Sequence, residues 1–251
     1  MRNISSWSID WGGRTVRIET GRYAHQADAA VTVQYGDTVI LATVVKSGSI
    51  REGIDYFPLM VSFEEKLYAA GKIKGSRFVK REGRPSDESV LTSRLVDRAL
   101  RPLFSDEIRN DIQVICTALS VDGENDASIV SLIAGSVVLA ISRIPFEGPI
   151  AAARIGHKAD GSFILNVTKS QLVSAESDLD LVVAGTSDRL VMVESGAKEV
   201  PEQVMIDAMK WGCGQLQPVI DLIARIQQEL GVQKDPIVID HESIAAKAKA
   251  L

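Results

Sequence analysis

AAGKIKGSRFVKREGRPS, residues 69–86, lies four residues before LTSRLVDRALRPLF, residues 91–104. The first segment sets basic side chains and glycines around a single aromatic residue, Phe78. The window Lys66–Arg101 holds ten Lys and Arg against four Asp and Glu, although the whole chain has a formal net charge of -5. One basic region in an acidic chain is typical of a polyanion-binding surface, and a solvated charged loop is the alternative interpretation.

The second segment has the pattern of a short amphipathic helix. Ser86 stands at the N-cap position, two acidic residues follow it, and Pro102 marks the end. On a 3.6-residue wheel the leucines share one side with the other apolar residues. The opposite side, which we expect to face away from the core, carries Arg94, Arg98 and Arg101.

Length and composition predict a folded protein with one large core or two fused small ones, because 45% of the 251 residues are hydrophobic. No apolar run approaches the roughly 20 residues of a membrane span, and the first residues lack the pattern of a secretion signal. Cys116 and Cys213 lie in patterns that favour buried free thiols, and the three histidines have no zinc-ligand spacing. We therefore predict a cytoplasmic protein without membrane contact.

Apolar periodicity predicts strands and helices along most of the chain. Helices are expected between Ser86 and Pro102, at 127–141 and at 202–230, where Pro218 should kink or interrupt the last one. After Gly231 the composition changes to a linker, and 242–251 has the pattern of a helix that begins another domain. The predicted strands are 15–20, 29–34, 38–45, 57–63, 112–119, 152–155, 179–184 and 189–194.

Several long motifs together resemble one known family. They are the basic segment and the helix quoted above, GGRTVRIETGRYAHQADAAV (12–31), IPFEGPIAAARIG (144–156) and LDLVVAGT (179–186). Between about Gly13 and Gly231 the chain is similar to the N-terminal ribonuclease-PH-type core of bacterial polynucleotide phosphorylases, or polyribonucleotide nucleotidyltransferases. The resemblance implies an α+β fold of mixed sheets packed with helices, of the kind named after ribosomal protein S5 domain 2.

The resemblance also implies a domain division and an activity. Residues 1–231 would form the first core, with subdomains at about 1–146 and 147–231, and 232–251 would begin a helical domain. Members of the family degrade RNA, including messenger RNA, from the 3′ end by phosphorolysis. Three chains form a ring around single-stranded RNA and can join RNA-degradation complexes. Inorganic phosphate and Mg²⁺ are expected at a second core, so no catalytic residue is predicted in this chain.

By the same resemblance, the basic segment 69–86, called the basic loop from here on, narrows the RNA channel around residues 78–81. Phe78 would stack on a base, while Lys80, Arg81 and Arg84 would contact phosphates. Arg94, Arg98 and Arg101 could extend this basic track along the helix. For Phe78 the alternative is a side chain folded back onto the core, and for the helix arginines it is an ordinary ion pair with Asp97.

Carboxylates argue against phosphorolysis by this core. In catalytic cores of the family the loop before the second helix cradles phosphate, but here it reads SVDGENDAS, with Asp122, Glu124 and Asp126 and no basic residue. Carboxylates there would repel a phosphate dianion. A magnesium site is the alternative, because Mg²⁺ prefers oxygen ligands. Asp180 resembles one member of a metal-binding pair, but Ser174 stands at its expected partner position, so we predict a structural role for Asp180.

Two other functions stay open from the sequence. The chain could be an autonomous ribonuclease-PH-like phosphorolytic nuclease for transfer-RNA ends. It could also be a noncatalytic ring scaffold that binds protein rather than nucleic acid. RNA retention that depends on Lys80, Arg81 and Arg84 would separate an RNA-guiding core from a scaffold.

Overall fold

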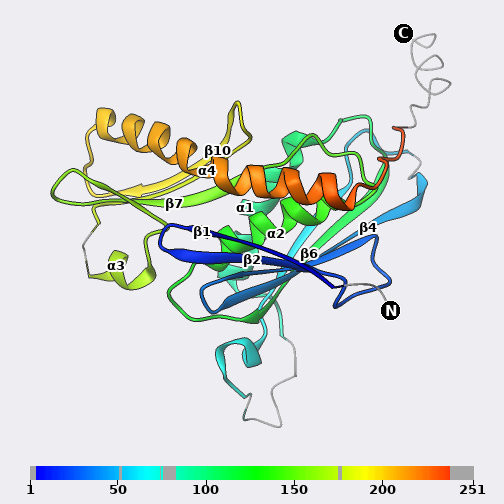
Figure 1. Ribbon diagram of the computed structural model, residues 1–251, viewed down its shortest axis with the longest axis horizontal. Coiled ribbons are helices and arrows are strands. Elements are labelled where there is room, and N and C mark those ends of the chain that lie inside the picture. Colours follow the sequence, from blue (N-terminus) through cyan, green and yellow to red (C-terminus); the bar gives the residue numbers. More distant parts are fainter. Residues whose placement is uncertain (1–3, 51–52, 74, 76–82, 175–176, 238–251) are drawn as a thin grey trace.

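Two β-sheets and four α-helices make up the described part of the protein (Figure 1). The computed structural model describes residues 4–50, 53–73, 75, 83–174 and 177–237. The larger sheet has six strands in the order β1-β2-β3-β4-β6-β5, and the smaller has four in the order β10-β9-β7-β8. The bounds are β1 Ser5–Trp11, β2 Arg14–Thr20, β3 Ala29–Tyr35, β4 Thr38–Ile50, β5 Leu59–Glu64, β6 Asn110–Ser120, β7 Ala151–His157, β8 Phe163–Leu165, β9 Leu179–Gly185 and β10 Leu190–Ala197.

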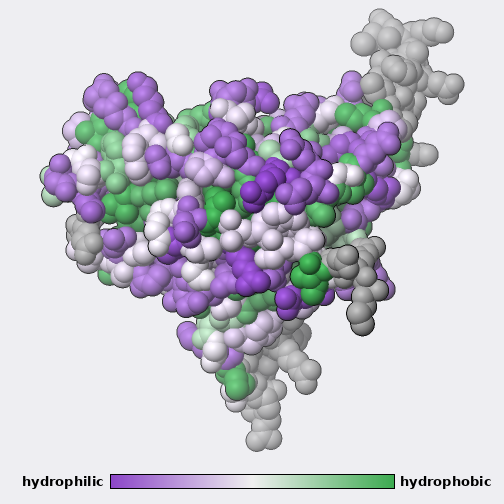
Figure 2. Space-filling model, in the orientation of Figure 1, coloured by the Kyte–Doolittle hydropathy of each residue, from purple (hydrophilic) through white to green (hydrophobic). Residues whose placement is uncertain are grey.

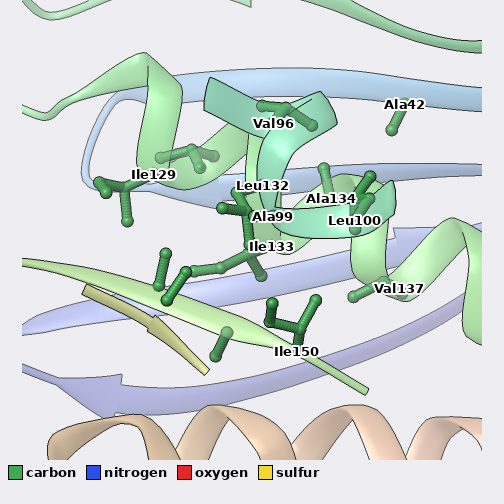
Figure 3. Close-up of a cluster of buried hydrophobic side chains, with 14 of the residues drawn as sticks. Ala42, Val96, Ala99, Leu100, Ile129, Leu132, Ile133, Ala134, Val137 and Ile150 are labelled. Atoms are coloured by element: carbon green, nitrogen blue, oxygen red, sulfur yellow. The ribbon is translucent and has the colours of Figure 1, made fainter. Parts of the chain in front are cut away.

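Helix α2 (Ala127–Ile141) is the centre of the core. Its sequence is apolar on every side, which is typical of a helix that is enclosed by other elements. Every residue of α2 after Ala127 is buried, and the helix contacts β3, β4 and β6 of the larger sheet and β7 of the smaller one. Figure 3 shows the apolar side chains around it, including Leu132 and Ile133 of α2, Val96, Ala99 and Leu100 of the neighbouring helix, and Ala42 of β4.

Three further helices complete the layers. Helix α1 (Asp87–Leu100) packs against β5 and α2, the short α3 (Lys169–Val173) follows β8, and α4 (Glu202–Leu230) lies across β7, β9 and β1. Two 3-10 turns, η1 (Leu67–Ala70) and η2 (Arg101–Leu103), flank α1 and the loop before it. None of the helices in the described part of the chain is long and apolar enough to cross a membrane.

The predicted interruption of the last helix is wrong, because α4 is one helix through Pro218. Proline removes one backbone donor and crowds the carbonyl four residues earlier, at Gly214. Both Pro218 and Gly214 are exposed, so water can solvate that carbonyl. The side chains that flank the proline, such as Leu216 and Val219, are buried, and their packing keeps the helix continuous.

The segment 232–237, predicted to be part of a linker, has no regular secondary structure but is attached to the core. The ammonium group of Lys234 donates to the carbonyl oxygens of Leu139, Ala140 and Ser142 at 2.8, 3.0 and 2.7 Å. It therefore binds carbonyls at the C-terminal end of α2, where a cation is favoured. Asp235 pairs with Lys46 and Arg143. The predicted start of a further helix at 242–251 lies outside the described residues.

Candidate nucleic-acid interface

The two ends of the basic loop meet at its base. The Ser86 hydroxyl donates to Glu65 at 2.6 Å and accepts the N–H of Ser89 at 3.0 Å, so it also caps α1 as predicted. Arg84 is described and exposed beside this contact. Phe78, Lys80 and Arg81, the central residues of the predicted RNA contact, lie outside the described residues.

A short anchored turn, η1, leads into the loop from the other side. Buried Ala69 accepts the N–H of Val121 at 3.0 Å, which attaches η1 to the end of β6. Gly71 ends the turn with a φ of 66°, in the left-handed region that glycine adopts without strain. In Figure 1, η1 lies on a cyan projection away from the sheets, and Figure 2 shows hydrophobic and hydrophilic surface side by side on that projection.

The three helix arginines have different environments. Arg94 is exposed. Arg98 pairs with Glu194 of β10 at 3.3 Å, and both side chains are about half exposed, at 53% and 52%. Arg101 makes the predicted ion pair with Asp97, through two hydrogen bonds of 2.9 and 2.6 Å.

Arg101 has further partners that fix the start of β5. Its guanidinium donates to the carbonyl oxygens of Phe57 and Leu59 at 3.1 and 3.0 Å. The same group lies 5.7 Å from the centre of the Phe57 ring. These contacts direct the guanidinium of Arg101 toward the protein itself. Of the predicted RNA-contact arginines that the structure describes, Arg84 and Arg94 are exposed without the ion pairs that Arg98 and Arg101 make.

The loop before α2, residues 120–128, is called the acidic loop here, and all three of its carboxylates have partners within the protein. Asp122 accepts the backbone N–H groups of Glu124, Asn125 and Asp37 at 2.8, 2.7 and 3.1 Å. Burial disfavours ionisation of Asp122, but the hydrogen bonds from Asn125 and its neighbours prevail and lower its pKa. The hydroxyl and N–H of Ser170 bind Glu124 and lower its pKa.

Asp126 and Asp180 share one arginine, Arg154 of β7. Nε and Nη2 of Arg154 donate to the two oxygens of Asp180, each at 2.7 Å, and Nη1 donates to Asp126 at 2.6 Å. Asp126 also caps α2 by accepting the N–H of Ser128 at 2.8 Å. The hydrogen bond with Asp180 is the main cause that raises the pKa of Arg154. We call Arg154, Asp126 and Asp180 the arginine bridge.

The arginine bridge does not fit a magnesium site. A divalent cation needs oxygen ligands that are free to face it, but both oxygens of Asp180 face a guanidinium. No three His, Cys, Asp or Glu side chains in the described part of the chain gather in a way that could hold a metal ion. Nor does the loop carry a basic group for phosphate, since Arg154 is already engaged by two carboxylates.

Sequence reasoning missed a second group of polar contacts beside the arginine bridge. Arg14 of β2 donates to the side chain of Asn125 and to the carbonyl oxygen of Asn166. Its guanidinium lies 4.8 Å from the centre of the Tyr35 ring. Asn166 donates to the Tyr35 hydroxyl at 2.9 Å, and burial is the main cause that raises the Tyr35 pKa. These contacts tie the larger sheet to the loop between β8 and α3.

Family profiles match most of the chain. Residues 12–145 match domain 1 of the 3′ exoribonuclease family, and residues 148–215 match domain 2. The chain belongs to the 3′ exoribonuclease family. This family is also known by its ribonuclease PH domains, so the predicted family and the predicted α+β core are confirmed.

Curated relatives in this family have the name that the sequence motifs predicted. A polyribonucleotide nucleotidyltransferase of Rhodospirillum centenum is 53% identical over 246 residues, covering 96% of this chain and 34% of the relative. The enzyme of that name from Hyphomonas neptunium is 49% identical over 251 residues, covering 100% of this chain and 34% of the relative. The chain therefore spans about a third of the length of these relatives, and the matched segment is their N-terminal part.

A solved structure has the same fold. The crystal structure of rice (Oryza sativa) Rrp46 matches with a TM-score of 0.66, covering 91% of this chain and 96% of that one. The two sequences are only 14% identical, so the likeness concerns the fold alone.

Proposed function

We propose that this chain is the RNA-guiding N-terminal core of a polyribonucleotide nucleotidyltransferase, an enzyme that shortens RNA from the 3′ end by phosphorolysis. In this proposal the chain binds single-stranded RNA and contributes to a trimeric ring. Bond cleavage, inorganic phosphate and Mg²⁺ belong to a second core. The cytoplasmic location and contacts with RNA-degradation complexes remain predictions from the sequence.

The arginine bridge is the observation that carries this division of labour. In the proposed scheme a catalytic core needs a basic group for phosphate and free carboxylates for a metal ion. Here the basic group and the carboxylates neutralise one another, at 2.6 and 2.7 Å. The anchored base of the basic loop supports the other half of the proposal, because it fixes the residues on either side of a segment rich in cations.

RNA affinity at several salt concentrations tests the proposal. We expect a fluorescent oligo(A) strand to bind, and the triple variant Lys80→Ala, Arg81→Ala, Arg84→Ala to bind at least about tenfold more weakly at low salt. The slope of log affinity against log salt is negative, and each lost phosphate contact makes it shallower by about 0.7. For three lost contacts the slope should therefore become less negative by about 2. Fluorescence anisotropy between about 50 and 200 mM KCl measures both quantities.

A matched control removes the same charge elsewhere. Lys158, Lys198 and Lys210 are exposed residues of the β7–β8 turn, the end of β10 and α4. Their triple alanine variant should bind RNA as the wild type does and keep its salt slope. Equal losses in both variants would point to net charge alone, and no loss in either would favour the noncatalytic scaffold.

A further inference from the structure

Tyr68 has a solvent-exposed aromatic side chain on a backbone that hydrogen bonds fix in place. Its side chain is 60% exposed, although the neighbouring Ala69 is buried at 8%. The carbonyl of Tyr68 accepts the N–H of Gly71, and the carbonyl of Leu67 accepts the N–H of Lys72, both at 3.0 Å. Since Ala69 is also bonded to Val121, the turn fixes the Tyr68 backbone while the side chain remains accessible.

Tyr68 is close along the chain to the base of the basic loop. Glu65 and Ser86 are joined by a 2.6 Å hydrogen bond, so the chain segments before and after the basic loop lie together. Tyr68 is three residues beyond Glu65, and Arg84 is two residues before Ser86. Arg84 and Lys72 are both exposed. An accessible aromatic ring and exposed cations thus occur together at the base of the loop.

We propose that Tyr68 is a base-stacking residue for single-stranded RNA. The inference rests on the proposed RNA-binding function and adds a described side chain to it. Aromatic rings stack on any nucleobase, while nearby cations hold the phosphates, a combination that binds single strands without sequence preference. The anchored turn reduces the ordering that binding requires, because its backbone is already fixed.

Another tyrosine provides a matched control. Tyr56 is 57% exposed, close to the 60% of Tyr68, but it precedes β5 whereas Tyr68 follows it. The two residues therefore flank opposite ends of one strand. A change of Tyr56 removes the same chemical group from a similarly exposed position, away from the base of the loop.

Binding of an oligo(A) strand and of an abasic strand of equal length separates stacking from charge. We expect Tyr68→Ala to weaken oligo(A) binding about tenfold, while Tyr68→Phe stays within about twofold of the wild type. The salt slope should not change, because stacking releases no counterions. Tyr56→Ala should bind normally, and the abasic strand should bind equally to all the variants.

Each other outcome overturns the inference in a recognisable way. Normal oligo(A) affinity in Tyr68→Ala, with a normal salt slope, would remove Tyr68 from the interface and leave the proposed function intact. An equal loss on the abasic strand would assign Tyr68 a structural role, which thermal unfolding of the variant would also reveal. Failure of the wild type to bind either strand would overturn the proposed function together with the inference.

Discussion

Replacing Arg154 with leucine is expected to lower the free energy of unfolding by about 2–4 kcal/mol at neutral pH. The change leaves the carboxylates of Asp126 and Asp180 without their shared cation. Breaking a fully buried ion pair costs about 3–5 kcal/mol, and the lower range reflects the 28% exposure of the Arg154 side chain. Urea unfolding followed by circular dichroism measures the difference.

Arg98→Leu is the matched control for that experiment. Arg98 also pairs with a carboxylate, Glu194, but both side chains are about half exposed, at 53% and 52%. Water and salt screen such pairs, so we expect a loss below about 1 kcal/mol. Equal losses for the two variants would show that the arginine bridge contributes no more than a surface ion pair.

Leu132→Ala in α2 should lower the free energy of unfolding by about 2–5 kcal/mol. Leu132 is fully buried between the two sheets, so its removal leaves a cavity that neighbours from several elements must fill. Denaturant unfolding is again the measurement. Because α2 contacts both sheets, we expect one unfolding transition whose midpoint moves to a lower denaturant concentration.

The control for Leu132 is a leucine of α1 that faces solvent. The helical wheel grouped Leu91 with the core-facing residues, but this expectation is wrong, because Leu91 is 65% exposed. Leu91→Ala should therefore change the stability by less than about 0.5 kcal/mol. A small effect of Leu132→Ala would contradict the central place of α2 in the core.

Local patterns were sufficient to predict many of the elements. Helix α2 is predicted at 127–141 and observed at Ala127–Ile141. In the structure Asp126 caps the start of this apolar helix and Ser142 stands at its end. The N-cap at Ser86 was likewise readable from the residues around it. Strand β1 was missed, since five of its seven residues are serine or tryptophan and its partner in the sheet, β2, is needed to orient them.

The polar contacts of the site could not be predicted in this way. Arg154 is 28 residues from Asp126 and 26 from Asp180 along the chain, and Arg14 is 111 from Asn125. No periodicity joins residues at such separations, so only the fold brings them together. The arginines of α1 show the related limit. Their spacing predicted one exposed stripe, but the start of β5 engages Arg101 and β10 engages Arg98.

The central claim is that this chain holds RNA without cleaving it by phosphorolysis. The most direct measurement incubates the purified chain with 3′-labelled single-stranded RNA, inorganic phosphate and Mg²⁺, and follows bound RNA and released nucleoside diphosphate together. We predict salt-dependent RNA binding and no nucleoside diphosphate. Phosphate-dependent release of nucleoside diphosphate by the wild type, lost in Asp180→Ala, would contradict the claim and make this core catalytic.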